Sequence, residues 1–170
     1  MVPLHPPPIR NFDYRGSYRY FLTWCCDWRK PLFANADSVD LARTQFLRTS
    51  EQTHMSMLAY CFMPDHVHLL AQGETDGADA KAFIRLAKQF SGYYYAKQEH
   101  HPLWQRYGYE RVLRNDESTR QVCRYILENP VRAGLVSDLR EYAHSGSALW
   151  ERPHLIEWAY EADEPRWQPR

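Results

Sequence analysis

The sequence predicts an α+β fold, specifically a ferredoxin-like sandwich in which helices flank a central antiparallel β-sheet. Three observations support this fold class. The predicted elements follow the order strand, helix, hairpin, helix, strand and helix. The chain has 170 residues, the size of one domain. Hydrophobic residues make up 44% of it, yet no apolar run is as long as a membrane span, so a globular protein without membrane contact is expected.

The first predicted strand is residues 18–26, which are dense in aromatic and β-branched side chains and have little polar content on either face. This composition is typical of a central strand. Charge and proline in residues 27–31 then break the pattern. Asp37 or Ser38 can cap the following helix, which is predicted to run to about Thr53.

A hairpin is predicted next, with strands at residues 57–62 and 66–72 joined by a turn at 63–65 that contains proline and aspartate. His66 and His68 begin the second strand. The period of two in a strand places both imidazoles on one face. Two nitrogen ligands on one face are a large part of a metal site, and a solvent-facing histidine pair is the alternative.

A second helix is predicted from about Ala80 to Gln98. Lys81, Arg85 and Lys88 share one exposed face of it at helical spacing. That face fits either ordinary solvated charge or a surface that follows DNA phosphates.

A further strand is predicted around residues 109–113, and a last helix from about 117 to 128 or 129. Pro130 is expected to end this helix because the residue before a proline is pushed away from helical geometry. Beyond Val136 the chain has no strong periodicity.

Three segments are predicted: an extended or disordered proline-rich start at residues 1–10, a folded domain at 11–148, and a partly ordered, acidic and aromatic tail at 149–170. We hypothesise that this tail folds over a positive face. The formal net charge is zero, which argues against an indiscriminate polyanion binder, but residues 79–114 carry seven Lys or Arg against three Asp or Glu. The start lacks a signal peptide and the four cysteines lack disulfide spacing, so a cytoplasmic protein is expected.

One face of the last predicted helix carries a tyrosine between two amides. Gln121, Tyr125 and Asn129 are spaced four residues apart and therefore lie along one side. Such a helix can place the Tyr125 phenol beside an incomplete metal site, with the amide oxygen of Asn129 as a further ligand. Glu128 and Gln121 are the alternatives for that ligand, and an asparagine before proline is also a common helix end.

Three motifs, MPDHVHLL, LWQRYGYERVLR and YILENPVRAGLV, follow one another in an order and at distances that resemble the HUH-class single-tyrosine transposases. The branch associated with repetitive extragenic palindromes is most similar, and the resemblance covers residues 18–136. It implies that His66 and His68 bind a divalent metal ion, Mg²⁺ or Mn²⁺, with Asn129 in the position of a third ligand. It also implies that Tyr125 attacks single-stranded, hairpin-forming DNA and forms a 5′-phosphotyrosine intermediate. Imidazole ligands suit Mn²⁺ or Zn²⁺ better than Mg²⁺.

Arginine forks suit phosphates and guanine edges, and aromatic rings stack on unpaired bases. The predicted DNA contacts are Trp104, Gln105, Arg114, Lys81, Arg85 and Lys88. A core position is the alternative for Trp104.

The favoured function is a metal-dependent endonuclease and strand transferase for single-stranded DNA, working as a monomer or homodimer. A replication- or transfer-initiating nickase of the same chemistry and a catalytically silent nucleic-acid-binding module are the alternatives. Retention of His66, His68 and Tyr125 together favours an active enzyme over the silent module.

Overall fold

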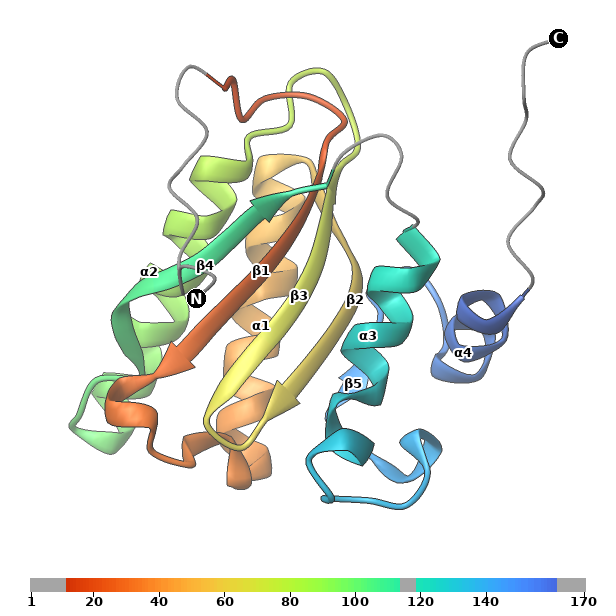
Figure 1. Cartoon of the computed structure of the whole chain (residues 1–170). Helices are drawn as coiled ribbons and strands as arrows, with labels where there is room; N and C mark the ends of the chain where they lie inside the picture. Colours follow the sequence, from red (N-terminus) through yellow and green to blue (C-terminus); the bar gives the residue numbers. More distant parts are fainter. Residues whose placement is uncertain (1–11, 114–118, 162–170) are drawn as a thin grey trace, which may run out of the picture.

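The computed structural model describes residues 12–113 and 119–161. Its strands are β1 Arg19–Cys26, β2 Met55–Met63, β3 His66–Gly73, β4 Trp104–Val112 and β5 Ser145–Gly146. Its α-helices are α1 Ala36–Thr53, α2 Ala80–Glu99, α3 Thr119–Arg132 and α4 Arg152–Tyr160, and short 3-10 helices lie at Asp27–Arg29, Leu32–Ala34 and Leu139–Glu141. The strands form one antiparallel sheet in the order β4-β1-β3-β2-β5 (Figure 1). The predicted ferredoxin-like arrangement is confirmed.

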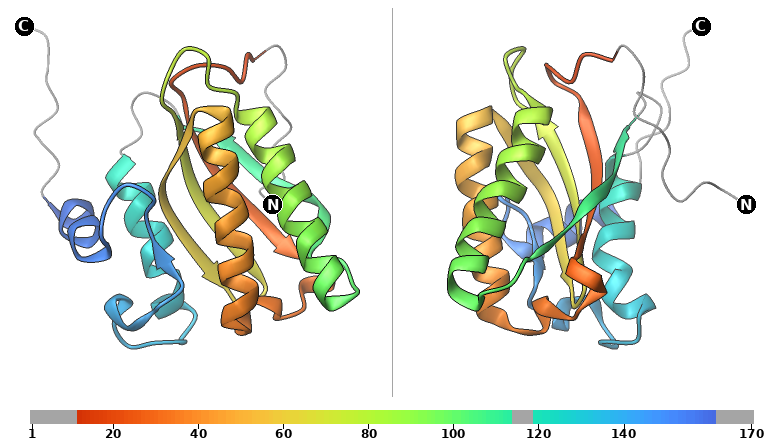
Figure 2. Two further views of the ribbon diagram at one scale, coloured as in Figure 1. Left: turned by 180° about the vertical axis from the view of Figure 1, so that it is seen from behind. Right: turned by 90° about the vertical axis from the view of Figure 1, so that its left-hand side faces the viewer.

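The sheet separates two layers of helices. Helices α1 and α2 cover one face, and α3 lies on the other, with α4 beside it (Figure 2). Alternation along β3 explains this division, because Leu69 belongs to the core under α1 and α2, whereas Leu70 belongs to the core under α3 and α4. Strand β2 is buried along its whole length, as expected for a strand that is covered on both faces. No helix in the described part of the chain is long and apolar enough to span a bilayer.

Two predicted boundaries near the site are wrong. Strand β4 begins at Trp104 instead of near residue 109, since Trp104 pairs with Cys26 across the sheet. Helix α3 continues past Pro130 to Arg132. The Asn129 Nδ2 atom donates to the Tyr125 carbonyl at 2.7 Å and lies 3.4 Å from the Ile126 carbonyl, the group that Pro130 leaves without its usual donor. This side chain therefore compensates in part for the proline.

The start of helix α1 differs from the prediction, and the C-terminal segment contains a further helix. Helix α1 begins at Ala36 and is capped by Asn35, whose side chain accepts from the backbone N–H of Asp37. The part of the tail at residues 149–161 contains α4, and Leu155 of α4 is fully buried in the core on the α3 side. This part of the predicted tail therefore packs on the domain through α4, and residues 162–170 lie outside the described residues.

Candidate active site

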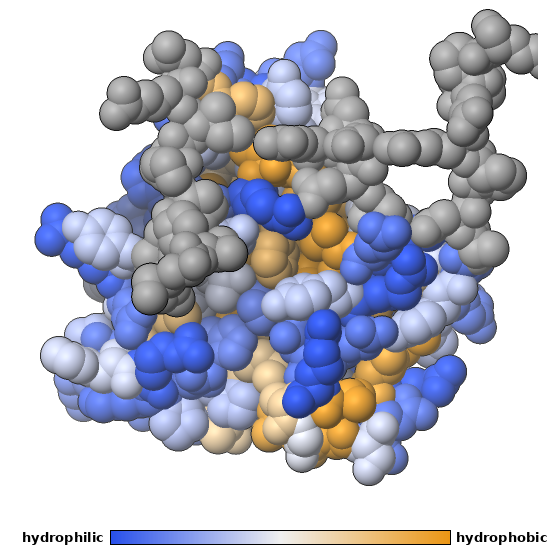
Figure 3. Space-filling model, viewed as in Figure 1, coloured by the Kyte–Doolittle hydropathy of each residue, from blue (hydrophilic) through white to orange (hydrophobic). Residues whose placement is uncertain are grey.

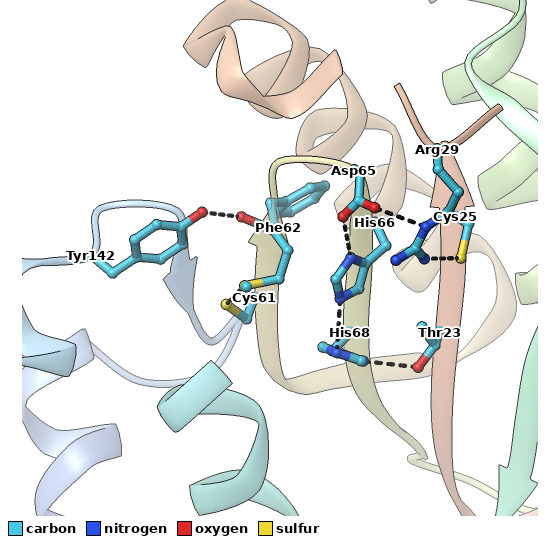
Figure 4. A network of polar contacts seen from close by, with 10 residues as sticks. Thr23, Cys25, Arg29, Cys61, Phe62, Asp65, His66, His68 and Tyr142 are labelled. Carbon is cyan, nitrogen blue, oxygen red and sulfur yellow. Dashed lines mark hydrogen bonds and ion pairs between the residues drawn. The ribbon is translucent and has the colours of Figure 1, made fainter. Parts of the chain in front are cut away.

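The histidine pair lies where β3 begins, on the face of the sheet that α3 partly covers (Figure 4). The Nε2 atoms of His66 and His68 are 3.1 Å apart. The Nδ1 atom of His66 lies 2.6 Å from a carboxylate oxygen of Asp65, and Nδ1 of His68 lies 2.8 Å from the Thr23 hydroxyl. The antiparallel register of β1 and β3 sets Thr23 directly opposite His68. Both imidazoles are therefore oriented through the nitrogen that faces away from the other ring.

The Asp65 contact selects the His66 tautomer that suits metal binding, whereas the Thr23 hydroxyl can pair with either tautomer of His68. A carboxylate only accepts hydrogen bonds, so His66 carries its proton on Nδ1. When His68 likewise donates Nδ1–H to Thr23, both Nε2 lone pairs converge on one point. Two nitrogen ligands at about 2.1 Å from one ion and about 90° apart are separated by about 3.0 Å, which matches the observed spacing. The pair fits a divalent cation, although no third histidine, cysteine or carboxylate completes a metal cluster in residues 12–113 and 119–161.

Burial keeps His68 neutral. Its side chain is 7% exposed, and desolvation lowers its pKa to about 3, with smaller contributions from His66, Arg132 and Arg29. A neutral imidazole is the form that binds a metal ion. His68 is therefore in the form that can bind a metal ion at physiological pH.

An arginine holds the Asp65 carboxylate in place. The Arg29 Nε atom lies 2.8 Å from one Asp65 oxygen, while the other oxygen faces His66. A second nitrogen of the same guanidinium donates to the Cys25 sulfur at 2.7 Å (Figure 4). The polar contacts thus form one continuous chain. It runs from the loop that follows β1 to the start of β3 and then back to β1, through Arg29, Asp65, His66, His68 and Thr23.

Tyr125 projects from α3 toward the same face. Its ring centroid lies 6.1 Å from that of His68 and 5.8 Å from that of Phe21, and 43% of the residue is exposed. The Arg132 guanidinium stacks over the Tyr125 ring at 4.3 Å, and Arg132 and Asn129 both donate to the Tyr125 carbonyl, at 2.5 and 2.7 Å. Asn129 thus follows Tyr125 by one turn on α3, and Arg132 lies one turn further on.

A cavity of about 600 Å³ brings these groups together. It lies between β1, β4 and α3, and its lining includes His68, Tyr125 and Gln105 together with Thr23, Cys25, Phe21, Arg106, Tyr107, Gly108 and Tyr109. Figure 3 shows this side of the molecule, where hydrophobic side chains are visible between hydrophilic ones. Aromatic rings beside cations and hydrogen-bonding groups suit a nucleic-acid strand.

The structure separates the predicted DNA contacts. Gln105 lines the cavity, whereas the Trp104 ring packs on Trp24 and its indole N–H donates to Ser91 at 2.9 Å. The Lys88 ammonium donates to the backbone carbonyls of Gln105 and Arg106, so it binds the backbone of β4. Trp104 therefore takes the core position that was its alternative.

The other predicted contacts lie elsewhere. Lys81 and Arg85 are exposed on α2, in the layer on the other side of the sheet from α3, and Lys81 lies over the Tyr14 ring. Arg114 lies outside the described residues. DNA binding by all six residues stays a prediction.

Sequence reasoning did not connect four residues with the histidine pair and Tyr125: Thr23, Arg29, Asp65 and Arg132. Asp65 directly precedes the histidine pair, and Arg132 follows Tyr125 by seven residues, which places both on the same helix side. These two were within reach of local pattern rules. Thr23 and Arg29 become part of the site only through the pairing of β1 with β3.

The model of the IS200-like transposase family matches residues 15–129. The chain belongs to this family. This IS200-like transposase is 27% identical over 144 residues to a Haemophilus influenzae protein that carries the name of a REP-associated tyrosine transposase, and the match covers 78% of the chain and 81% of that relative. Its fold is shared with a solved REP-associated tyrosine transposase bound to a REP hairpin, at a TM-score of 0.67 and 19% identity over 82% of each chain. Family membership makes it a DNA-processing enzyme.

Proposed function

We propose that this transposase cleaves and rejoins single-stranded, hairpin-forming DNA in a metal-dependent reaction, with Tyr125 as the nucleophile. The observation that carries the proposal is the convergence of the His66 and His68 Nε2 atoms, 3.1 Å apart, beside a cavity that Tyr125 also lines. Hairpin DNA is the favoured substrate because the solved protein of the same fold is bound to a REP hairpin.

His66 and His68 would hold a divalent cation, Mg²⁺ or Mn²⁺, which when bound polarises the scissile phosphate as a Lewis acid. Asn129 remains our candidate for a third ligand. Its Nδ2 atom donates to the Tyr125 carbonyl of the same helix, so the amide oxygen points away from that carbonyl. Glu128 is less suited, because it accepts a hydrogen bond from Tyr160 of α4 at 2.7 Å.

The chemical steps follow from the position of the phenol. The Tyr125 oxygen attacks the phosphorus in line, so a phosphorus–oxygen bond to the tyrosine forms as the bond to the 3′-oxygen breaks. The phenol loses its proton and the departing 3′-oxygen gains one. A 3′-hydroxyl can later attack the phosphotyrosine and rejoin the strand, releasing Tyr125. Arg132, which stacks on the ring and binds its carbonyl, holds the nucleophile in position.

One chain supplies all the proposed groups. Tyr125 lies within ring contact of His68 of the same chain, so either a monomer or each copy in a homodimer can carry the site. This arrangement needs no exchange of α3 between copies.

The test is covalent trapping. The protein is incubated with end-labelled hairpins from the flanks of its own gene in Mn²⁺ or Mg²⁺, and adducts are separated on a denaturing gel. Wild type is expected to give a labelled adduct that disappears with a chelator and in Tyr125→Phe. Tyr93→Phe, on the exposed surface of α2, is the matched control and is expected to give the adduct. Hairpin binding without an adduct under any condition would instead support the silent binding module.

A further inference from the structure

The 3-10 helix Asp27–Arg29, directly after β1, contains an unusual combination of features. Trp28 is 82% exposed, more than any other large hydrophobic side chain in the described residues. Trp28 and Arg29 also have backbone φ angles of 52° and 55°, in the left-handed region that residues other than glycine and asparagine rarely adopt. An indole therefore stands in solvent on a strained backbone.

The loop is fastened to the turn that precedes the histidine pair. The Cys26 N–H donates to the Asp65 carbonyl at 2.9 Å, and the Phe33 N–H donates to the Pro64 carbonyl at the same distance. Arg29 pairs with the Asp65 side chain (Figure 4). Backbone bonds on both sides of Trp28 thus fix its position relative to His66.

Two further backbone hydrogen bonds hold the residues on either side of the strained pair. The Asp27 N–H donates to the Leu103 carbonyl at 2.8 Å, and the Lys30 N–H closes the turn on Asp27 at 3.1 Å. Strained backbone of this kind persists where surrounding structure determines it, and it clusters at binding and catalytic sites. Packing does not explain the tryptophan, because most of its surface touches solvent.

The surroundings of Trp28 indicate which ligand it fits. Arg29 and Lys30 follow it directly and are exposed, and an aromatic ring beside cations is the arrangement by which proteins bind unpaired bases and their phosphates. A second exposed ring, Tyr107 at 70%, lines the cavity from β4 with the Arg106 guanidinium over it. Strand β4 and the loop are in contact.

We propose that Trp28 is a stacking site for an unpaired nucleobase in the single-stranded segment that flanks the scissile phosphate. This inference rests on the proposed function, because it assumes that single-stranded DNA reaches the histidine pair. It adds a contact to the base itself, which lets the protein distinguish a hairpin with an unpaired extension from a fully paired one.

The experiment measures binding of two fluorescent hairpins with the same stem, one blunt and one with a single-stranded extension. All proteins carry Tyr125→Phe, so binding is measured without cleavage. Trp28→Asn removes the ring and keeps a residue that accepts a left-handed backbone, and Trp28→Tyr retains a stacking ring. Tyr93→Ala, an exposed ring on α2, is the matched control.

Trp28→Asn is expected to weaken binding of the extended hairpin by about 5- to 150-fold, the range for loss of one base stack, and to leave the blunt hairpin unchanged. Trp28→Tyr should recover most of the affinity, and Tyr93→Ala should bind like its parent. The Tm of Trp28→Asn should be no lower than that of the parent, because the ring is exposed and the backbone is relaxed.

Unchanged affinity of Trp28→Asn for the extended hairpin would overturn the inference, and so would an equal loss for both hairpins. The adduct test on wild type keeps this result separate from the proposed function. An adduct together with normal binding by Trp28→Asn would refute the stacking site alone. Absence of both DNA binding and adduct in wild type would refute the proposed function and the inference with it.

Discussion

Replacing Thr23 by valine should weaken metal binding without touching a proposed ligand. Thr23 lies 2.8 Å from Nδ1 of His68, and its hydroxyl can accept the Nδ1 proton, which leaves Nε2 free to bind a metal ion. Without the hydroxyl the proton can move to Nε2, where it blocks the lone pair that faces His66. Loss of such a partner costs a ligating histidine about 10- to 100-fold in metal affinity, or about 1.4–2.7 kcal/mol. Because His68 is only 7% exposed, water replaces the hydroxyl poorly, and a loss near the upper end is expected.

The assay is a titration with Mn²⁺, in which the free ion is counted by electron paramagnetic resonance. Thr23→Ser is the matched control, since it keeps the hydroxyl and should bind Mn²⁺ within a few-fold of wild type. The urea midpoints of both variants show whether β1 is intact. Equal Mn²⁺ affinity of the valine and serine variants would refute the assignment of the His68 tautomer.

Three further outcomes are expected. Burial lowers the pKa of His68 to about 3, so below a pH of about 6.5 the unfolded state binds more protons than the folded state. The free energy of unfolding of metal-free wild type should therefore fall on acidification more steeply than that of His68→Gln, by up to about 1.4 kcal/mol per pH unit. Parallel curves of urea stability against pH for the two proteins would contradict this. Arg132→Lys keeps the charge but loses the planar stack on Tyr125, so single-turnover adduct formation should slow by about 10- to 100-fold, and an unchanged rate would remove the positioning role. Gly108→Ala would place a Cβ atom 2.6 Å from the buried Trp24 ring and should cost about 1–3 kcal/mol in urea unfolding, a cost that an unshifted midpoint would exclude.

Local periodicity predicted the parts of the site that depend on one element. A period of two put His66 and His68 on one face of a strand, and spacing by four put Tyr125 and Asn129 on one side of a helix. Neither rule says that this strand and this helix meet. The resemblance to the single-tyrosine transposases supplied that step, and the contact of the Tyr125 and His68 rings bears it out as geometry. Their catalytic roles stay predictions.

Local rules failed where a distant or compensating contact decides the structure. Pro130 was expected to end α3, but the Asn129 side chain donates to the Ile126 carbonyl, which the proline leaves without its usual donor, and Pro130 itself is buried. Trp104 looked like a loop residue, although its backbone pairs with Cys26, 78 positions earlier in the sequence. Helix α4 has no clear amphipathic pattern, so only its packing against α3 reveals it. Each case requires tertiary information.

The charges around the histidine pair indicate what kind of further ligand the proposed metal site would take. Imidazole ligands add no negative charge to a cation, and the Asp65 carboxylate beside them is paired with Arg29. Arg132 adds a further positive charge over the ring of Tyr125, the proposed nucleophile, and is close enough to lower the pKa of His68. The residues described here therefore leave the site net positive once it holds a divalent ion. A phosphate oxygen of a DNA strand would balance this charge, so we expect the metal to bind more tightly in the presence of hairpin DNA than in its absence.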